Sequence, residues 1–260
     1  MASRVSTFRP DSSLVAEVRP SPNHGERKLS GKPDMIVLHY TGMSDTDAAL
    51  AKLCAAGTDV SAHYVVMENG HIVQCVPEER RAWHAGAASW EGETDVNSCS
   101  IGIEIANPGH SHGYPNFPKR QIAAVIMLCR SILTRHRIPP WRVLGHSDVA
   151  PNRKKDPGEK FPWDALYKAG IGLWVKAAPV VVGGPLFVLG EKDQTIREVQ
   201  ERLSKYGYDV PISGDYDGQT RDVVAAFQRH FRPARVDGVV DTSTIVTIGA
   251  LSAARAAVSD

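Results

Sequence analysis

Residues 35–42 read Met35-Ile36-Val37-Leu38-His39-Tyr40-Thr41-Gly42. Pro33-Asp34 precedes this apolar run and Gly42 follows it, so the pattern predicts a short, fully buried strand that presents His39 at its end. The stretch Arg142-Val143-Leu144-Gly145-His146 repeats the arrangement farther along the chain. If the two strands end side by side, their imidazole groups converge.

An acidic residue stands in the polar loop that follows the second of these strands. Asp156 comes ten positions after His146, within Lys154-Lys155-Asp156-Pro157-Gly158. Its carboxylate could complete a three-ligand metal site with an open fourth position, which is the arrangement that a catalytic zinc ion requires. The chain has ten histidines, however, and a structural role is the alternative for each of them.

The remaining segments alternate between strand and helix patterns. Asn-Gly within Glu68-Asn69-Gly70 predicts a hairpin between two β-rich runs. We expect strands at 60–67, 71–76 and 100–106 and helices at 45–56 and 119–136. This alternation predicts an α/β fold in which a central mixed β-sheet is flanked by helices.

Composition shifts along the chain predict four parts. Residues 1–32 are rich in Pro, Ser and Arg and predict an extended N-terminal arm, irregular at 21–25. We expect the α/β domain at 33–175, a Pro/Gly linker at 176–188 and a small domain at 189–260. The small domain shows three helix patterns, and two similar Gly/Asp turns before the second and third helices suggest an internal repeat.

The composition also excludes some classes of partner. Thirty basic and 29 acidic residues leave a net charge of +1, so we expect no nucleic acid as a partner. No segment has the apolar length of a membrane span, so we expect no insertion into a membrane. Four widely spaced cysteines without a CxxC pair predict free buried thiols.

Two further side chains are candidates for chemistry. In Ile101-Gly102-Ile103-Glu104-Ile105, strand alternation directs Glu104 away from the face that the isoleucines cover. Glu104 is either a general base in the metal cleft or a strand glutamate that faces solvent. Lys154 precedes Asp156 by two positions and could stabilise a developing oxyanion; otherwise it is an ordinary loop lysine.

Tyr40, His63, Trp83 and His84 are the candidate substrate-binding residues. Trp83 could offer a sugar or a peptide an apolar wall beside His84. For His63 and His84 the alternative is core packing with a hydrogen-bonded imidazole.

Several of these motifs together resemble the ordered signatures of the type 2 N-acetylmuramoyl-L-alanine amidases, which are bacterial zinc enzymes. The resemblance spans about residues 20–173 and rests on the following motifs: Ile36-Val37-Leu38-His39-Tyr40-Thr41, Val60-Ser61-Ala62-His63-Tyr64, Arg81-Ala82-Trp83-His84-Ala85-Gly86, Ser100-Ile101-Gly102-Ile103-Glu104 and Gly145-His146-Ser147-Asp148 with Lys154 and Asp156. It implies that one Zn²⁺ is bound by His39, His146 and Asp156, with Glu104 as the base and Lys154 supporting the transition state.

The C-terminal part resembles a three-helix peptidoglycan-binding domain. The motifs include Val199-Gln200-Glu201-Arg202-Leu203, Tyr206-Gly207-Tyr208 and Val224-Ala225-Ala226-Phe227-Gln228. Tyr216-Asp217 stands where that family often has Phe-Gly.

The resemblance implies hydrolysis of the amide between N-acetylmuramic acid, with its 1,6-anhydro form as one candidate, and L-alanine of the stem peptide. Peptidoglycan fragments or muropeptides would then be the partners, in cell-wall turnover or recycling. A non-catalytic peptidoglycan-binding or sensing protein is the alternative. Residues 1–20 show no apolar leader, which favours the cytoplasm, whereas a wall-binding domain favours a periplasmic or wall-associated protein. The sequence does not predict an oligomeric state.

Overall fold

The computed structural model describes residues 7–28 and 31–258. It divides the chain into two compact units, Met1–Gly86 with Asp95–Leu144 and Ala87–Thr94 with Gly145–Asp260. The parts of the expected N-terminal arm at 1–6 and 29–30, and residues 259–260 of the expected small domain, lie outside the described residues. In the part of the chain that is described, no helix has the length and apolar character of a membrane span.

A six-stranded mixed sheet forms the centre of the first unit, in the order β1-β5-β4-β7-β3-β8. The strands are β1 (Glu17–Val18), β3 (Met35–Tyr40), β4 (Tyr64–Val66), β5 (Ile72–Gln74), β7 (Ser100–Ile105) and β8 (Val143–Gly145). The β3 strand pairs in parallel with β7, and both are apolar and almost entirely buried, as expected for central parallel strands. This sheet confirms the predicted fold class.

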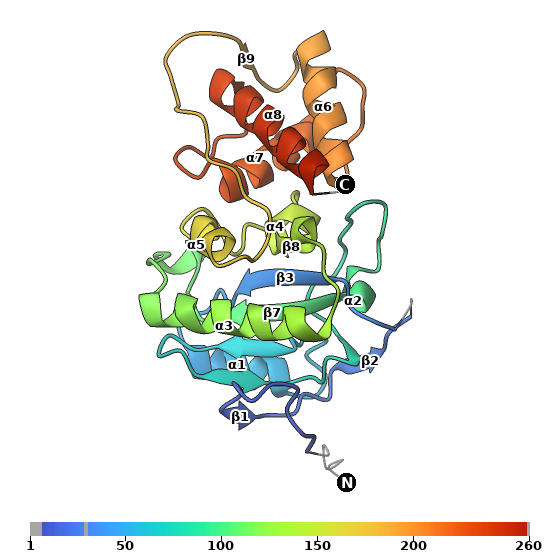
Figure 1. Cartoon of the computed structure of the whole chain (residues 1–260), viewed down its shortest axis with the longest axis vertical. Helices are drawn as coiled ribbons and strands as arrows, with labels where there is room; N and C mark the ends of the chain where they lie inside the picture. The colour runs from blue at the N-terminus through green and yellow to red at the C-terminus, as the bar shows by residue number, and fades with distance from the viewer. Residues whose placement is uncertain (1–6, 29–30, 259–260) are drawn as a thin grey trace. The chain divides into compact units, whose positions relative to one another are not determined.

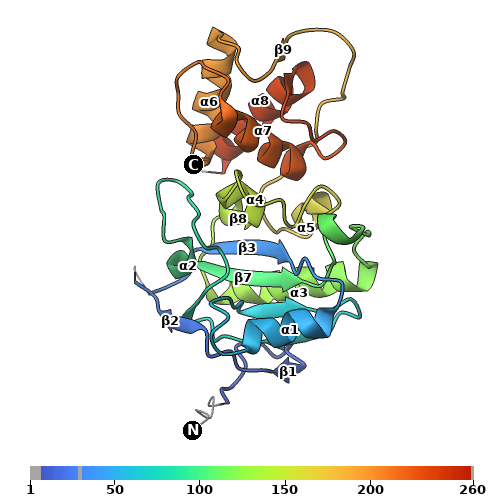
Figure 2. The same cartoon turned by 180° about the vertical axis from the view of Figure 1, so that it is seen from behind.

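Helices cover both faces of this sheet. The long helix α3 (Lys119–Arg135) lies over one face, in front of β7 in Figure 1. The shorter α1 (Thr46–Cys54) lies over the other face, as the view from behind in Figure 2 shows. Asp45 caps α1 by accepting a hydrogen bond from Ala48 N at 3.1 Å. Under α1, Leu50 and Leu53 pack on Val65 and Val73 of the sheet.

The hairpin between β4 and β5 is confirmed, but its strands are shorter than predicted. Residues 60–62 lie outside β4; the Ser61 N–H, for example, donates to Trp83 O. The segment 21–25 was predicted to be irregular, and this was wrong for His24 and Gly25. They begin β2 (His24–Glu26), which gains regular pairing from an antiparallel partner, β6 (Arg80–Ala82).

Short elements complete the first unit and lead into the second. They are α2 (Val96–Cys99), η1 (His110–His112), η2 (Pro140–Arg142), α4 (His146–Val149) and α5 (Trp163–Lys168). All four cysteines are free thiols, as predicted, and three of them are buried, whereas Cys54 is half-buried.

Three helices dominate the C-terminal part of the second unit (Figure 1), namely α6 (Gln194–Tyr206), α7 (Gly218–Phe231) and α8 (Thr242–Ala257). A two-stranded ladder joins β9 (Leu186–Phe187) to β10 (Val240–Asp241), so the predicted linker contains a short strand. Asp217 caps α7 through Thr220 N and Asp241 caps α8 through Thr244 N, each at 2.7 Å. These matching caps confirm the internal repeat.

Candidate metal centre

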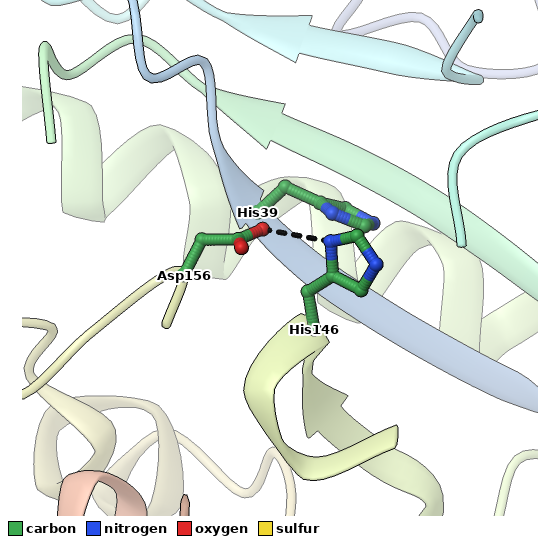
Figure 3. A group of neighbouring side chains, drawn as sticks. All are labelled: His39, His146 and Asp156. Atoms are coloured by element: carbon green, nitrogen blue, oxygen red, sulfur yellow. Dashed lines mark hydrogen bonds and ion pairs between the residues drawn. The ribbon is translucent and has the colours of Figure 1, made fainter. Parts of the chain in front are cut away.

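The structure brings together the three residues that the sequence predicted as metal ligands (Figure 3). His39 is the fifth residue of β3, and His146 follows β8 directly, which neighbours β3 in the sheet. One nitrogen or oxygen atom from each of His39, His146 and Asp156 lies within 4.8 Å of the other two. All three side chains are buried.

Close backbone packing holds the two ligand segments of the second unit against each other. The N–H of Ser147 donates to the carbonyl oxygen of Asp156 at 2.9 Å, and Nδ1 of His146 lies 3.0 Å from Oδ2 of Asp156. A Cβ atom at Gly145 would lie only 2.8 Å from Cδ of Pro157. A glycine before His146 therefore lets the Asp156 loop approach.

A chain of hydrogen bonds fixes the tautomer of His39. The Ser100 hydroxyl donates to Val96 O, so its oxygen accepts from Nε2 of His84 at 3.1 Å. In neutral His84, Nδ1 then carries a lone pair and accepts from Nε2 of His39 at 3.1 Å. Nδ1 of His39 keeps its own lone pair, which is the form in which an imidazole binds a metal ion.

The position of His84 is in turn fixed by hydrogen bonds and close packing. The N–H groups of His84 and Ala85 donate to Oδ1 of Asn97 at 3.0 and 2.8 Å. A Cβ atom at Gly102 would lie 2.3 Å from Cγ of His84. The imidazole thus lies on the strand surface at Gly102, where no other residue type leaves room for it.

Glu104 lies beside His39 because of strand register. The two residues are direct partners in the parallel β3–β7 ladder, and Glu104 is half-buried. Residues two apart on a strand share a face, so Glu104 is on the face of β7 that carries His84 above Gly102. Lys154 is half-buried too, and its N–H donates to Ala150 O at 3.0 Å in the turn after α4.

The candidate substrate-binding residues have different surroundings. Tyr40 belongs to an aromatic cluster that the sequence analysis missed: its hydroxyl lies 3.0 Å from Nδ1 of His110, whose ring stacks on Tyr114 at 4.2 Å. The run His110-Ser111-His112-Gly113-Tyr114 could have indicated this cluster, because it contains three ring side chains within five residues of a loop. Trp83 is half-buried, and its backbone pairs with Ser61.

His63 is completely buried, and its side chain is hydrogen-bonded to the backbones of β7 and β6. Its Nδ1 accepts from Gly102 N at 3.0 Å, so the proton is on Nε2, which donates to Arg80 O at 3.0 Å. Burial, together with the nearby Arg27 guanidinium, lowers the pKa of His63 to about 3. His63 is therefore neutral, and a role in substrate binding stays a prediction.

The donor set fits a catalytic zinc ion. Two imidazoles and one carboxylate are ligands that zinc prefers, and three protein ligands leave a position for a reacting group. No cysteine of the described residues belongs to the group, which argues against a closed, thiolate-rich structural site. A mixed α/β sheet with this buried His/His/Asp group at its strand ends defines a candidate metal-dependent hydrolase.

Comparison with known families gives the class more narrowly. Residues 29–159 match the family described as N-acetylmuramoyl-L-alanine amidase, and residues 192–248 match a putative peptidoglycan binding domain. The N-acetylmuramoyl-L-alanine amidase AmiD of Escherichia coli (strain K12) is 40% identical over 225 residues, which cover 81% of this chain and 79% of AmiD. The chain belongs to the N-acetylmuramoyl-L-alanine amidase family.

Two solved structures are similar over most of the chain. The complex of E. coli AmiD with anhydro-N-acetylmuramic acid-L-Ala-D-γ-Glu-L-Lys has a TM-score of 0.69 and 34% identity, and covers 88% of this chain and 96% of that one. AmpDh3 of Pseudomonas aeruginosa in complex with an anhydromuramic pentapeptide has a TM-score of 0.70 and 32% identity, covering 90% and 95%.

Proposed function

We propose that this chain is a zinc-dependent amidase that hydrolyses the bond between N-acetylmuramic acid and L-alanine of the peptidoglycan stem peptide. The observation that carries the proposal is the buried group of His39, His146 and Asp156 in a chain of this family. Two imidazoles and a carboxylate whose donor atoms converge in the interior are the ligand types of a catalytic zinc site.

His39, His146 and Asp156 would hold the ion, and His84 would keep His39 in the tautomer that binds it. When bound, zinc would supply a Lewis acid that lowers the pKa of water toward neutrality and polarises the substrate carbonyl. Glu104, beside His39 in the ladder, would accept a proton from the attacking water and return it to the leaving amine of L-alanine. The Lys154 ammonium would stabilise the oxyanion of the tetrahedral intermediate.

Tyr40, His110 and Tyr114 offer a surface for the sugar end of the substrate. Their rings lie within 5.9 Å of one another, centroid to centroid, and Tyr40 and His110 are half-exposed. Aromatic faces with polar tips suit a sugar or an acyl-peptide, which present both apolar and hydrogen-bonding groups. Trp83 is proposed as an additional wall.

The 1,6-anhydro form of the muramyl group is the proposed substrate to test first. Support comes from AmiD and AmpDh3, whose complexes contain anhydromuramyl peptides. Soluble anhydro-muropeptide and intact sacculi should be digested in parallel, and equal rates on both would remove the preference.

The decisive experiment follows release of stem peptide from a purified muropeptide by mass spectrometry. We expect free peptide and intact sugar from the zinc-loaded protein, loss of the reaction after chelation, and recovery when zinc is restored. Glu104→Gln should lower kcat by about 10²- to 10⁴-fold, the usual contribution of a general base, while zinc stays bound. The matched control is Glu79→Gln, at an exposed position.

A different result would favour the non-catalytic alternative. If the zinc-loaded protein binds the muropeptide and leaves it whole, the roles of Glu104 and Lys154 are wrong, and the chain is a recognition protein.

A further inference from the structure

A buried carboxylate two residues after the candidate ligand His146 is held by side chains of the C-terminal part of the chain. Asp148 is 1% exposed and accepts three hydrogen bonds. Oδ2 accepts from Gly145 N at 2.7 Å and from Nδ1 of His230 at 2.8 Å, and Oδ1 accepts from the hydroxyl of Tyr208 at 2.7 Å. Two of the three donors therefore come from the part of the chain that matches the peptidoglycan binding domain.

Asp148 determines the shape of the turn that presents His146. Gly145 and Asp148 flank the histidine, and the bond between them closes the first turn of α4. This helix is a single turn of four residues, too short to be stable by itself. Its conformation, and with it the direction of the His146 side chain, depends on the partners of Asp148.

His230 also reaches the second ligand segment. The ring stacks on the indole of Trp163 with centroids 3.7 Å apart and an interplanar angle of 20°. Trp163 begins α5, a few residues after Asp156, and is buried. One histidine of α7 thus contacts both α4 and the helix that ends the Asp156 loop.

The loop Ala87–Thr94 adds a second connection within the same unit. Trp90 is completely buried between Tyr206 and Tyr208, at ring distances of 5.5 and 5.0 Å. A Cβ atom at Gly207 would lie 2.4 Å from the indole. Ser89 N then donates to Val149 O, the last residue of α4, at 2.8 Å. The Tyr-Gly-Tyr motif is thus used for internal packing.

We infer that Tyr208 and His230 are positioning residues for the metal site, acting on His146 through Asp148. The C-terminal helices then complete the catalytic centre, whereas a domain that serves only as a wall anchor would raise the local concentration of polymer and leave the site unchanged. The inference rests on the proposed function in taking His146 as a zinc ligand.

The test compares two Tyr→Phe variants of the full-length chain. Tyr208→Phe removes the hydroxyl that donates to Asp148. Tyr216→Phe is the matched control, because Tyr216 is equally buried in the same helical part and its hydroxyl donates to Gly238 O. Zinc affinity is measured by competition with a chromophoric chelator. Tyr208→Phe should weaken zinc binding about tenfold, the lower end of the range for outer-shell partners, with Tyr216→Phe unchanged.

A second pair of variants separates positioning from simple packing. His230→Leu removes the donor to Asp148 and should also weaken zinc binding. In His230→Asn, the side-chain amide nitrogen is separated from Cα by the same number of bonds as Nδ1 of histidine. It can therefore donate to Asp148, and zinc affinity should be much closer to that of the parent chain. If His230 served only for packing, both variants would lose zinc affinity to the same extent, since both lose the stacking on Trp163.

Activity on a soluble anhydro-muropeptide completes the experiment. The inference expects Tyr208→Phe to lower kcat/KM on this small substrate as much as on sacculi, whereas a wall anchor would lose activity on sacculi alone. If Tyr208→Phe and Tyr216→Phe bind zinc as tightly as the parent chain, the inference is overturned and the proposed function stands. If the parent chain itself binds no zinc, the proposed function fails first.

Discussion

Gln200 and Gln228 make the same set of hydrogen bonds, one helix apart. Each is fully buried, and its amide oxygen accepts from two backbone N–H groups of the following turn while its amide nitrogen donates to a threonine in the first turn of the next helix. The partners are Ser213, Gly214 and Thr220 for Gln200, and Asp237, Gly238 and Thr244 for Gln228. Equivalent glutamine hydrogen bonds thus stabilise both copies of the internal repeat.

Replacing either glutamine by leucine should destabilise the C-terminal helices strongly. Gln228→Leu leaves the buried N–H group of Gly238 without its acceptor, which costs about 1–3 kcal/mol in the free energy of unfolding. Urea unfolding measures the change, with Gln194→Leu at an exposed helix position as the control. Equal midpoints for the two variants would contradict this account.

Gly102→Ala should impair the metal centre while the sheet still forms. The added methyl group would overlap His84, which must move and release Nε2 of His39. We expect zinc affinity to fall by about tenfold or more. The control is Gly25→Ala, since a Cβ atom at Gly25 meets nothing within 4 Å. Unchanged zinc binding in Gly102→Ala would show that His84 does not orient His39.

Glu78 should make stability depend on acid pH. Burial alone would raise the pKa of Glu78, but hydrogen bonds from His136, Arg135 and Tyr64 outweigh it and lower the pKa to about 2, from 4.5. A carboxyl with a lowered pKa contributes stability above its unfolded pKa, so this contribution is complete above pH 4.5 and disappears toward pH 2. It amounts to roughly 3 kcal/mol.

Glu78→Gln tests this prediction by urea unfolding at a series of pH values. The variant should be less stable than the parent chain near neutral pH, and its stability should fall less steeply below pH 4.5. Glu17→Gln, at an exposed strand position, should keep the slope of the parent chain. If the free energy of unfolding depends on pH with the same slope in all three proteins, Glu78 is not the cause of the acid dependence.

Zinc should raise the melting temperature of the chain. An ion that binds only the folded state stabilises it by about 2.7 kcal/mol when its concentration is a hundred times Kd. Calorimetry with and without a chelator measures the shift. His146→Ala, which removes one of the three candidate ligands, should abolish most of it. A zinc-dependent rise that persists in His146→Ala would place the ion elsewhere.

The sequence predicted those features that depend on local pattern. His39 and His146 each follow an apolar run, and this is visible without any tertiary information. Strand alternation likewise directed Glu104 away from the isoleucine face, and the ladder places it beside His39. The Asn-Gly turn was sufficient to predict the β4–β5 hairpin.

The hydrogen bonds that support the metal ligands from distant segments were not predicted. The bond from His39 to His84 crosses 45 positions, and the bond from Asp148 to His230 crosses 82. Nothing in the pattern around His24 indicates β2, because its partner strand β6 supplies the regular pairing. The cellular compartment stays a prediction of the sequence.

The enclosure of Trp90 by Tyr206, Gly207 and Tyr208 sets a rule for exchanging parts between relatives. A chimera that takes its C-terminal helices from another amidase inherits a new surface where this indole must be enclosed. Such a swap has to transplant the loop Ala87–Thr94 along with the helices, although more than eighty residues of sequence separate them. The segments that must be exchanged together are therefore not contiguous in the sequence.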